Sequence, residues 1–327
     1  MTTLSNFFQS VSKPLVIVST IPMKDQEVIA DFLVRLNAPV YLEGVSGLRE
    51  NPRLQHLRIT YLKDICVDAV FRIGGVPTHR IWRDLEEKKG QLRLLSFSHL
   101  PWPGVSWGEV IEGDYQQLAE ELFHYEKAWH VEDTQLKEIS GKLFRQYPKS
   151  EPALIGRISS LIPEKSLVYL GNSLPIREWD LAATNENRKY EIYASRGMNG
   201  IDGQISTFLG MTQPYRSNWC ILGDLTALYD LAAPWILEQL EPREITIVVI
   251  NNGGGMIFSR MSERECLQNK HTIDFEYFAK FWKMNYFNEE GLSLKPEGVR
   301  LIEAVPCAKQ TNQFWNAYDK LLLNNYF

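Results

Sequence analysis

The chain has 327 residues, of which 44 % are hydrophobic and 23 % charged, and its formal net charge is −5. These values are ordinary for a globular protein, and the length favours two domains. The small negative charge argues against a dedicated nucleic-acid-binding surface, which normally carries a basic excess. No apolar run approaches the ~18 residues that a membrane-spanning helix needs, and residues 1–13 lack the apolar core of a secretory signal peptide.

Four cysteines are spread along the chain, at Cys66, Cys220, Cys266 and Cys307. None stands at metal-ligand spacing from another, and their distribution resembles no disulfide framework. A reducing compartment is therefore expected, and we predict a cytoplasmic protein.

Residues 1–130 are expected to form a first domain. Short apolar runs predict four buried strands, at Pro14–Thr20, Pro39–Leu42, Asp68–Ile73 and Leu92–Phe97. Between the first two strands, Asp25–Leu36 carries apolar residues at helical spacing. The polar stretch Gln116–Trp129 predicts a helix that leads into a linker. Alternation of strand and helix at this spacing is typical of a doubly wound sheet.

Residues 131–327 are expected to form a second domain of the same kind. Apolar runs predict strands at Ser166–Leu170, Tyr190–Ala194, Trp219–Leu222, Glu244–Ile250 and Val299–Ala304. Helices are expected at Glu151–Ile162 and Asn312–Leu323. The continuous β-branched run Glu244–Ile250 indicates a strand that is buried on both faces, as in parallel sheets. The expected fold class is therefore α/β, with two doubly wound parallel-sheet domains.

Polar residues follow two of these strands directly. Gly223-Asp224 comes after Trp219–Leu222, and Asn251-Asn252 comes after Glu244–Ile250. Ligands of open parallel sheets bind outside the carboxyl ends of the strands, so both pairs are predicted at the ligand-binding edge. Either pair alone is usually a turn or a strand-end loop, but the combination favours a functional site.

The residue types at this edge suit a hard divalent cation that carries a diphosphate. Mg²⁺ takes oxygen ligands and keeps phosphate oxygens among them. Asp224 offers a carboxylate, Asn252 an amide oxygen and Gly254 a backbone carbonyl. We favour Asn252 over Asn251 as the ligand, since Gly254 then falls two residues later.

A helix is expected to follow this motif and to present free N–H groups to the diphosphate. Its start near Thr226, with Gly223 before it and Ala227 within it, would form an anion site. The helical pattern runs over Ala227–Leu240, and Pro234 is expected to kink it two turns beyond the binding end.

The spacing of the two pairs resembles the thiamine-diphosphate fingerprint, because 26 residues, Leu225 to Ile250, separate Asp224 from Asn251. Four segments resemble one family in particular: GNSLPIR at 171–177, RGMNGIDG at 196–203, GDLTALYD at 223–230 and NNGGGMIFS at 251–259. In these segments the chain is similar to the 2-succinyl-5-enolpyruvyl-6-hydroxy-3-cyclohexene-1-carboxylate (SEPHCHC) synthase family of menaquinone biosynthesis. Leucine at position 225 fits this family, whereas glycine is usual elsewhere in the superfamily.

The resemblance implies a carboligase that uses thiamine diphosphate with Mg²⁺ or Mn²⁺. It decarboxylates 2-oxoglutarate and adds the remaining four-carbon unit to isochorismate. Arg177, Arg196 and Ser173 are the implied catalytic residues, with the two arginines facing the isochorismate carboxylates. Implied substrate contacts are Asn172, Arg80, Ile257, Phe258 and Met261. Implied cofactor contacts are Gly197, Ile201, Gly223, Thr226, Ala227 and Ile257, with Ile201 wedged beneath the bent cofactor.

Members of this family have three domains, and the first supplies a glutamate that activates the aminopyrimidine ring. The sequence opens on what resembles the second domain. We therefore expect a pyrimidine domain to be supplied in cis or in trans, within a homo-oligomer. Without that domain, the chain is expected to be inactive.

Three other functions compete with this interpretation. Another split thiamine-diphosphate 2-oxoacid decarboxylase would share Asp224 and Asn252 but need no isochorismate pocket. A non-catalytic homologue would bind partners only, which the intact metal-ligand set argues against. A nicotinamide dehydrogenase is disfavoured because no Gly-x-Gly-x-x-Gly follows an early strand.

Overall fold

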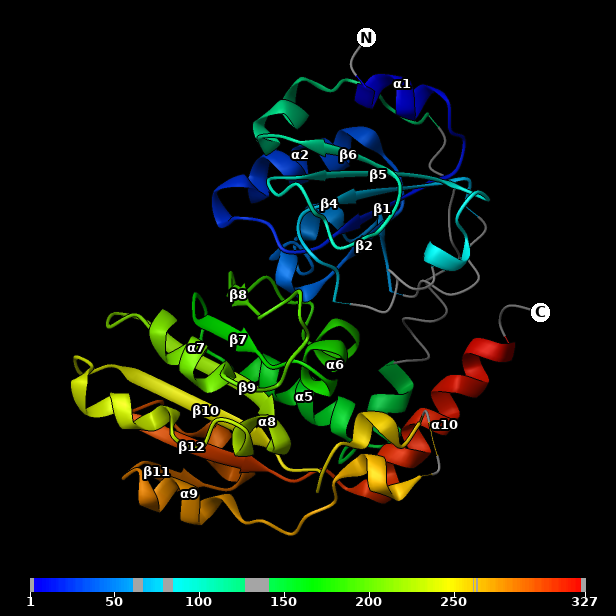
Figure 1. Ribbon diagram of the computed structural model, residues 1–327. Helices are drawn as coiled ribbons and strands as arrows, with labels where there is room; N and C mark the ends of the chain where they lie inside the picture. Colours follow the sequence, from blue (N-terminus) through cyan, green and yellow to red (C-terminus); the bar gives the residue numbers. More distant parts are fainter. Residues whose placement is uncertain are drawn as a thin grey trace. The chain divides into compact units, whose positions relative to one another are not determined.

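The computed structural model describes residues 3–60, 67–78, 85–126, 141–260, 262 and 264–324. The chain divides into two compact units, Met1–Ser140 with Asn325–Phe327 and Gly141–Asn324. Within the described ranges each unit holds one six-stranded sheet, and all strand pairs are parallel (Figure 1). The α/β class expected from the sequence is confirmed. The expected boundary at residue 130 lies outside the described residues.

The first unit has the strand order β3-β2-β1-β4-β5-β6. The chain turns back between β1 and β4, which is the arrangement of doubly wound sheets. Its strands are β1 Pro14–Val18, β2 Val40–Leu42, β3 Arg58–Ile59, β4 Ala69–Ile73, β5 Arg93–Ser98 and β6 Glu109–Glu112. The helices whose bounds fall within the described residues are α1 Thr3–Gln9 and α2 Gln26–Leu36, with 3-10 helices at Met23–Asp25, Gly44–Ser46, Pro52–Leu54 and Tyr115–Glu120.

Alternation along β1 gives this sheet its two hydrophobic faces. Val16 and Val18 join one core cluster with α1, α2 and the 3-10 helix Tyr115–Glu120. Leu15 and Ile17 join a second cluster on the opposite face. Successive side chains of a strand point to opposite faces, so a strand covered on both sides is apolar throughout.

The second unit has the strand order β11-β12-β10-β9-β7-β8. Its strands are β7 Leu167–Leu170, β8 Glu191–Tyr193, β9 Ser217–Gly223, β10 Glu244–Ile250, β11 Asn285–Phe287 and β12 Val299–Ala304. The α-helices whose bounds the described residues define are α5 Glu151–Leu161, α6 Leu174–Ala182, α7 Gln204–Met211, α8 Asp224–Leu228, α9 Phe275–Phe281 and α10 Ala308–Asn324. The 3-10 helices are Ala233–Gln239, Met256–Phe258, Glu265–Gln268 and Glu289–Ser293.

The direction of winding in the second sheet reverses between β7 and β9. From β7 the chain crosses to the edge strand β8, then returns to β9 on the other side of β7. Helices α7 and α9 cover one face, where they share a core cluster with alternate residues of β9 and β10. A reversal of this kind opens a crevice at the carboxyl ends of the strands, where ligands bind.

Two helices expected from the sequence take a different form. The stretch Ala227–Leu240 is not one helix, because α8 ends at Leu228 and a separate 3-10 helix begins at Ala233. Pro234 lies in the first turn of this second helix, where its missing N–H costs nothing. Of the described residues in the stretch Gln116–Trp129, residues 116–120 belong to the 3-10 helix Tyr115–Glu120, and residues 121–126 form no helix.

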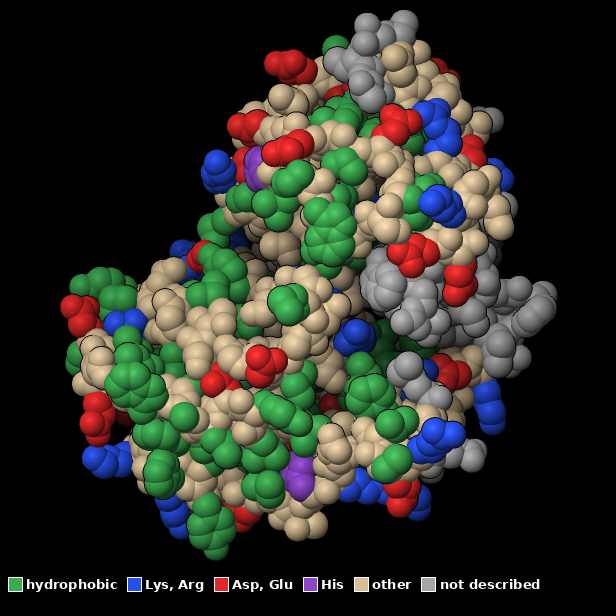
Figure 2. All heavy atoms as spheres, in the orientation of Figure 1, with side chains coloured by type: hydrophobic (Ala, Val, Ile, Leu, Met, Phe, Trp, Pro, Cys, Tyr) green, Lys and Arg blue, Asp and Glu red, His purple; other side chains and the backbone are tan. Residues whose placement is uncertain are grey.

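Charged side chains of both signs are scattered over the visible surface (Figure 2). No described helix combines the length and the apolar character needed to cross a membrane.

Candidate functional site

The strand register brings the two polar motifs of the second unit together. Gly223, the last residue of β9, pairs with Ile250, the last residue of β10. Asp224 and Asn251 therefore leave neighbouring parallel strands at the same level. β7 ends on the other side of β9, where Leu170 pairs with Ile221. Three consecutive strands thus deliver their following loops to one edge of the sheet.

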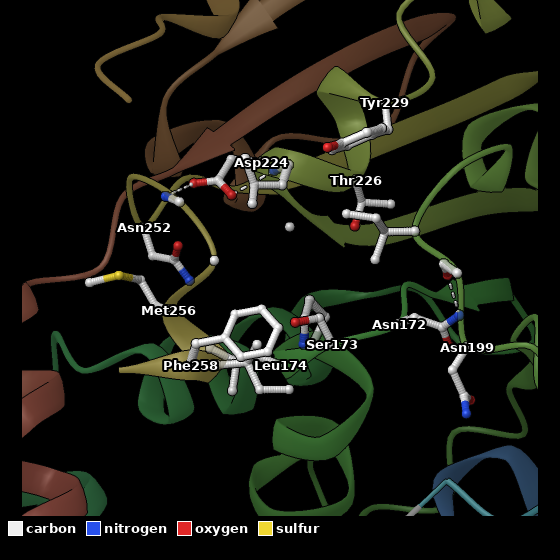
Figure 3. A pocket seen from close by; sticks show the side chains of 18 of the residues that line it. Asn172, Ser173, Leu174, Asn199, Asp224, Thr226, Tyr229, Asn252, Met256 and Phe258 are labelled. Atoms are coloured by element: carbon white, nitrogen blue, oxygen red, sulfur yellow. Dashed lines mark hydrogen bonds between the residues drawn. The ribbon is translucent and has the colours of Figure 1, made fainter. Parts of the chain in front are cut away.

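A cavity of about 590 Å³ lies at this edge. Its lining comes from four loops that follow β7, β8, β9 and β10. The lining residues are Asn172, Ser173, Leu174, Pro175, Arg177, Arg196, Asn199, Gly200, Ile201, Asp202, Gly223, Asp224, Leu225, Thr226, Tyr229, Asn252, Gly254, Gly255, Met256, Ile257 and Phe258. Figure 3 shows Asp224 and Asn252 on one side of this cavity and Asn172 and Asn199 on the other.

Asp224 is held by the backbone on both sides of its carboxylate. Oδ2 accepts hydrogen bonds from the N–H groups of Gly253 and Gly254, at 2.8 and 2.9 Å. Oδ1 accepts one from Leu225 N at 2.6 Å. His271 Nε2 lies 3.2 Å from Oδ2, at ion-pair distance. Burial raises the pKa of the Asp224 carboxyl, and these N–H groups and the His271 ring oppose the shift.

The neighbouring asparagines face in different directions. Asn251 donates its Nδ2 hydrogens to Glu303 Oε1 and to the carbonyl of Ile273. Asn252 donates to both carboxyl oxygens of Glu151, each at 3.0 Å. Its Oδ1 is buried and has no hydrogen-bond partner among the described residues. Only Asn252 of the two lines the cavity.

The turn after Asn252 is shaped by glycine. Gly254 has φ +141, and a Cβ there would meet the carbonyl of Gln268 at 2.4 Å. Its own carbonyl accepts a hydrogen bond from Met256 N, which leaves a second lone pair for another donor or a cation.

The opposite wall begins with the loop after β7. Asn172 is buried, and its Nδ2 donates to the carbonyl of Gly200 at 2.6 Å. Its Oδ1 accepts from Arg196 at 2.7 Å. Ser173 has φ +79 and ψ −128, a backbone conformation that residues other than glycine rarely adopt. Such outliers persist where surrounding contacts enforce them, and they cluster at functional sites.

Two arginines reach the same wall. Arg177, on α6, donates to the carbonyl of Ser173. Arg196, after β8, donates to Asn172. Both line the cavity, and their hydrogen bonds place the two guanidinium groups beside Asn172 and Ser173.

Most of the predicted site residues converge here. The predicted residues that line the cavity are Asn172, Ser173, Arg177, Arg196, Ile201, Gly223, Asp224, Thr226, Asn252, Gly254, Ile257 and Phe258. Gly197 is not among the lining residues, and Ala227 lies in the hydrophobic core instead. Arg80 and Met261 fall outside the described residues. The catalytic, substrate-binding and cofactor-binding roles expected for all of these residues remain predictions.

Several residues of the site were not predicted. Asn199 and Met256 lie inside segments that the resemblance had marked, so their neighbours were the available signal. Glu151 and His271 gave no such signal, because each reaches the site through a tertiary contact. Glu151 in sequence is simply an acidic residue in the first turn of a helix.

Known proteins resemble this chain in fold and in sequence. No family model matches the chain. A solved structure of benzoylformate decarboxylase from Polynucleobacter necessarius superposes with a TM-score of 0.63 at 15 % identity, over 93 % of this chain and 63 % of that one. Fold and site together define the class: an α/β protein with two parallel six-stranded sheets, like benzoylformate decarboxylase, with a cavity at the strand ends of the second sheet.

Two relatives found by sequence share one name, SEPHCHC synthase. The chain is 41 % identical to SEPHCHC synthase of Bdellovibrio bacteriovorus, over 96 % of this chain and 63 % of that protein. It is 32 % identical to SEPHCHC synthase of Akkermansia muciniphila, over 85 % of this chain and 56 % of that protein. The resemblance seen in the four segments is thus confirmed, and the chain is a relative of the SEPHCHC synthases. It spans less than two thirds of the length of these relatives.

Proposed function

We propose that the second unit binds thiamine diphosphate through a divalent cation, Mg²⁺ or Mn²⁺. The observation that carries this proposal is the pairing of Gly223 with Ile250, which sets Asp224 and Asn252 on one cavity wall. Asp224, Asn252 and the carbonyl of Gly254 would hold the cation. The proposed cofactor contacts are Gly223, Thr226, Ile201 and Ile257. Gly197 and Ala227 would contribute through their backbone atoms.

The donors present fit this group. The buried Asn252 Oδ1 lacks a hydrogen-bond partner among the described residues, and burial without a partner is costly. A cation at this point would satisfy it. All three donors are oxygens, which is the preference of Mg²⁺. The described residues contain no group of three or more His, Cys, Asp and Glu side chains that could hold a metal, so a softer metal has no comparable set.

We further propose the reaction that the relatives' name describes. The cofactor, when bound, supplies the electron sink for decarboxylation of a 2-oxo acid, here 2-oxoglutarate. Arg177 and Arg196 line the cavity and would bind isochorismate carboxylates through their forked donors. Asn172 holds Arg196 in place, and Ser173 presents its hydroxyl from a fixed backbone. Ile257 and Phe258 would exclude water from the apolar face of the substrate, with Met261 and Arg80 as further proposed contacts.

The proposed setting is a cytoplasmic homo-oligomer. A pyrimidine-binding domain, in cis or in trans, would complete the cofactor site. The substrates are small molecules, and no nucleic-acid or membrane partner is proposed.

The test of cofactor binding is Asp224→Ala. Asp224 is the only charged ligand in the proposed set, so its loss should abolish Mg²⁺-dependent binding of thiamine diphosphate, measured by calorimetry with and without Mg²⁺. Asp202→Asn is the control, because it removes a carboxylate from the same cavity and not from the proposed cation site. Unchanged affinity in Asp224→Ala, or an equal loss in Asp202→Asn, contradicts the metal assignment.

A further inference from the structure

Glu151 is a buried carboxylate that the proposed function does not use. It stands in the first turn of α5 and is 2 % exposed. Its backbone is fixed from two directions. Ser150 caps the helix by accepting from Ala153 N, and Glu151 N donates to Thr311 Oγ1 at 3.0 Å. Because the backbone of Glu151 is fixed, its side chain is suited to hold another group in place.

The group that Glu151 holds is the side-chain amide of Asn252, 101 positions away in sequence. Nδ2 lies 3.0 Å from both carboxyl oxygens of Glu151. The amide nitrogen therefore faces the carboxylate, and Oδ1 is turned the other way. That oxygen is the one with no hydrogen-bond partner in the described part of the chain.

An asparagine amide can be rotated by half a turn, which exchanges its oxygen and its nitrogen. The reversed Asn252 would set its carbonyl oxygen against the carboxyl oxygens of Glu151 and would direct N–H donors into the cavity. N–H donors repel a cation, whereas a carbonyl oxygen binds it. The carboxylate of Glu151 therefore decides which end of the amide the cavity receives.

We propose that Glu151 is a positioning residue that orients the Asn252 amide, so that Oδ1 is offered to the divalent cation. The inference rests on the proposed function, since it names a residue that prepares the same cation site. Outer partners of metal ligands commonly contribute in this way, and their loss costs roughly 10- to 100-fold in metal affinity.

The neighbouring asparagine provides a matched control. Glu303 is also buried, and it accepts a hydrogen bond from Asn251 Nδ2 at 2.6 Å. It holds the adjacent amide through one carboxyl oxygen, while the other accepts from Phe275 N and Tyr286 Oη. Asn251 does not line the cavity. Glu151→Gln and Glu303→Gln thus make the same chemical change at two consecutive asparagines.

The experiment titrates Mn²⁺ into the full chain at a fixed concentration of thiamine diphosphate. Electron paramagnetic resonance separates free from bound Mn²⁺, and thiamine diphosphate without protein is the blank. Glu151→Gln should weaken Mn²⁺ binding roughly 10- to 100-fold, because glutamine also accommodates the reversed amide. Glu151→Asp keeps the carboxylate on a shorter stem and should recover part of the affinity. Glu303→Gln should stay within about twofold of the unmodified chain.

A second measurement separates positioning from folding. Calorimetric unfolding should show some loss of thermal stability in both glutamine variants, since both lose a buried hydrogen bond. Only Glu151→Gln should also change Mn²⁺ affinity. In the cation-free chain, the side-chain amide resonance of Asn252, assigned through Asn252→Asp, should shift in Glu151→Gln and stay in place in Glu303→Gln.

The outcomes distinguish this inference from the proposed function. Equal Mn²⁺ affinity in the unmodified chain and Glu151→Gln overturns the positioning role, while the cation site stands if Asp224→Ala still abolishes binding. A loss in Glu303→Gln without a loss in Glu151→Gln overturns it too, and assigns the ligand to Asn251. If the unmodified chain binds no Mn²⁺–thiamine diphosphate, the proposed function fails and the inference fails with it.

Discussion

At the residue scale, the polar atoms of the cavity divide into those that the protein satisfies and those that it leaves for a ligand. Asp224 Oδ2 is saturated by two backbone N–H groups. Asn252 Nδ2 is saturated by Glu151, while Asn252 Oδ1 is not satisfied by any described residue. Asp224 Oδ1 accepts one backbone hydrogen bond, from Leu225 N, and keeps a further lone pair. Both side chains are thus held in place by the protein, which prepares a binding site before its ligand arrives.

The arginines of the opposite wall give a prediction about substrate charge. In the assembled enzyme, Arg177→Ala should raise the KM for isochorismate by roughly tenfold or more, since a charge-assisted hydrogen bond contributes about 1.5–3 kcal/mol. Arg196→Ala should do the same. Steady-state kinetics measures the effect. The affinity for Mg²⁺–thiamine diphosphate should stay nearly constant, and a fall in that affinity would place these arginines at the diphosphate instead.

Glu178 gives a prediction about pH. It lies on α6, is 1 % exposed, and neither carboxyl oxygen has a hydrogen-bond partner among the described residues. Burial raises its pKa well above the ordinary value, the negative charge of Glu151 adds to this, and Arg260 opposes it. A raised carboxyl pKa contributes stability that is complete below the unfolded value, about 4.3, and lost as the pH rises towards the folded value.

Glu178→Gln should therefore stabilise the chain more at about pH 8 than at about pH 5, by roughly 1 kcal/mol for each unit by which the folded-state pKa exceeds pH 5. Urea unfolding at both pH values measures the difference. The exposed Glu164→Gln controls for the loss of one negative charge. An equal effect of Glu178→Gln at both pH values would show that Glu178 does not carry this cost.

The sequence was enough to predict the site residues that directly follow neighbouring strands. It was not enough to predict the site residues that other segments of the chain contribute. Asp224 and Asn252 were predictable because parallel strands end at a common edge. Their partners Glu151 and His271 come from a helix start and a distant loop, where residue type alone predicts no contact. The backbone conformation of Ser173 had no sequence signal either, because positive φ is a property that glycine normally carries.

At the scale of elements, the buried strands were the most predictable part. A continuous apolar run such as Glu244–Ile250 predicts a buried strand directly. By contrast, β3 and β11 have two and three residues, which is too few to show a strand pattern in the sequence. The stretch Ala227–Leu240 shows the limit of periodicity. Its apolar residues keep helical spacing through residues 229–232, where the helix is interrupted. A separate 3-10 helix then begins at Ala233, with Pro234 in its first turn.

The turn after β10 gives a prediction at this scale. In Gly254→Ala the new Cβ would lie 2.4 Å from the Gln268 carbonyl, on a backbone with φ +141. The free energy of unfolding should fall by about 2–4 kcal/mol, through strain and overlap together. Cofactor affinity should fall too, because the same turn positions Asn252 and the Asp224 hydrogen bonds. Urea denaturation and calorimetry measure the two effects.

Gly210→Ala is the matched control for that change. Gly210 lies in α7, and a Cβ there meets nothing within 4 Å. This substitution should stabilise the chain by about 0.4–1 kcal/mol, because alanine restricts the unfolded chain without strain. A similar loss in both variants would mean that the Gly254 turn has no special requirement for glycine.

At the scale of the whole molecule, the described cation-site residues belong to the second unit alone. The winding reversal between β7 and β9 puts the cavity where ligands of such sheets bind. The resemblance, however, assigns the group that activates the aminopyrimidine to a further domain. Binding of the diphosphate and turnover should therefore be separable properties.

The corresponding prediction concerns the 327 residues on their own. We expect them to bind Mg²⁺–thiamine diphosphate weakly and to release no CO₂ from 2-oxoglutarate above background, with or without isochorismate. Addition of a pyrimidine domain from a relative should restore turnover if the parts dock. Robust turnover without that domain would mean that a carboxylate within this chain activates the cofactor.

The lengths of the strands also bear on how this protein behaves in concentrated solution. The outermost strands of the two sheets, β3, β6, β8 and β11, have two to four residues, against five to seven in the central strands β1, β4, β9 and β10. β6 also carries a glutamate at each end. Short, charged edge strands offer few unpaired backbone N–H and C=O groups to another molecule. Edge-to-edge pairing of sheets from two molecules, which would begin aggregation, is therefore disfavoured. The long strands that could template such pairing are enclosed within the sheets.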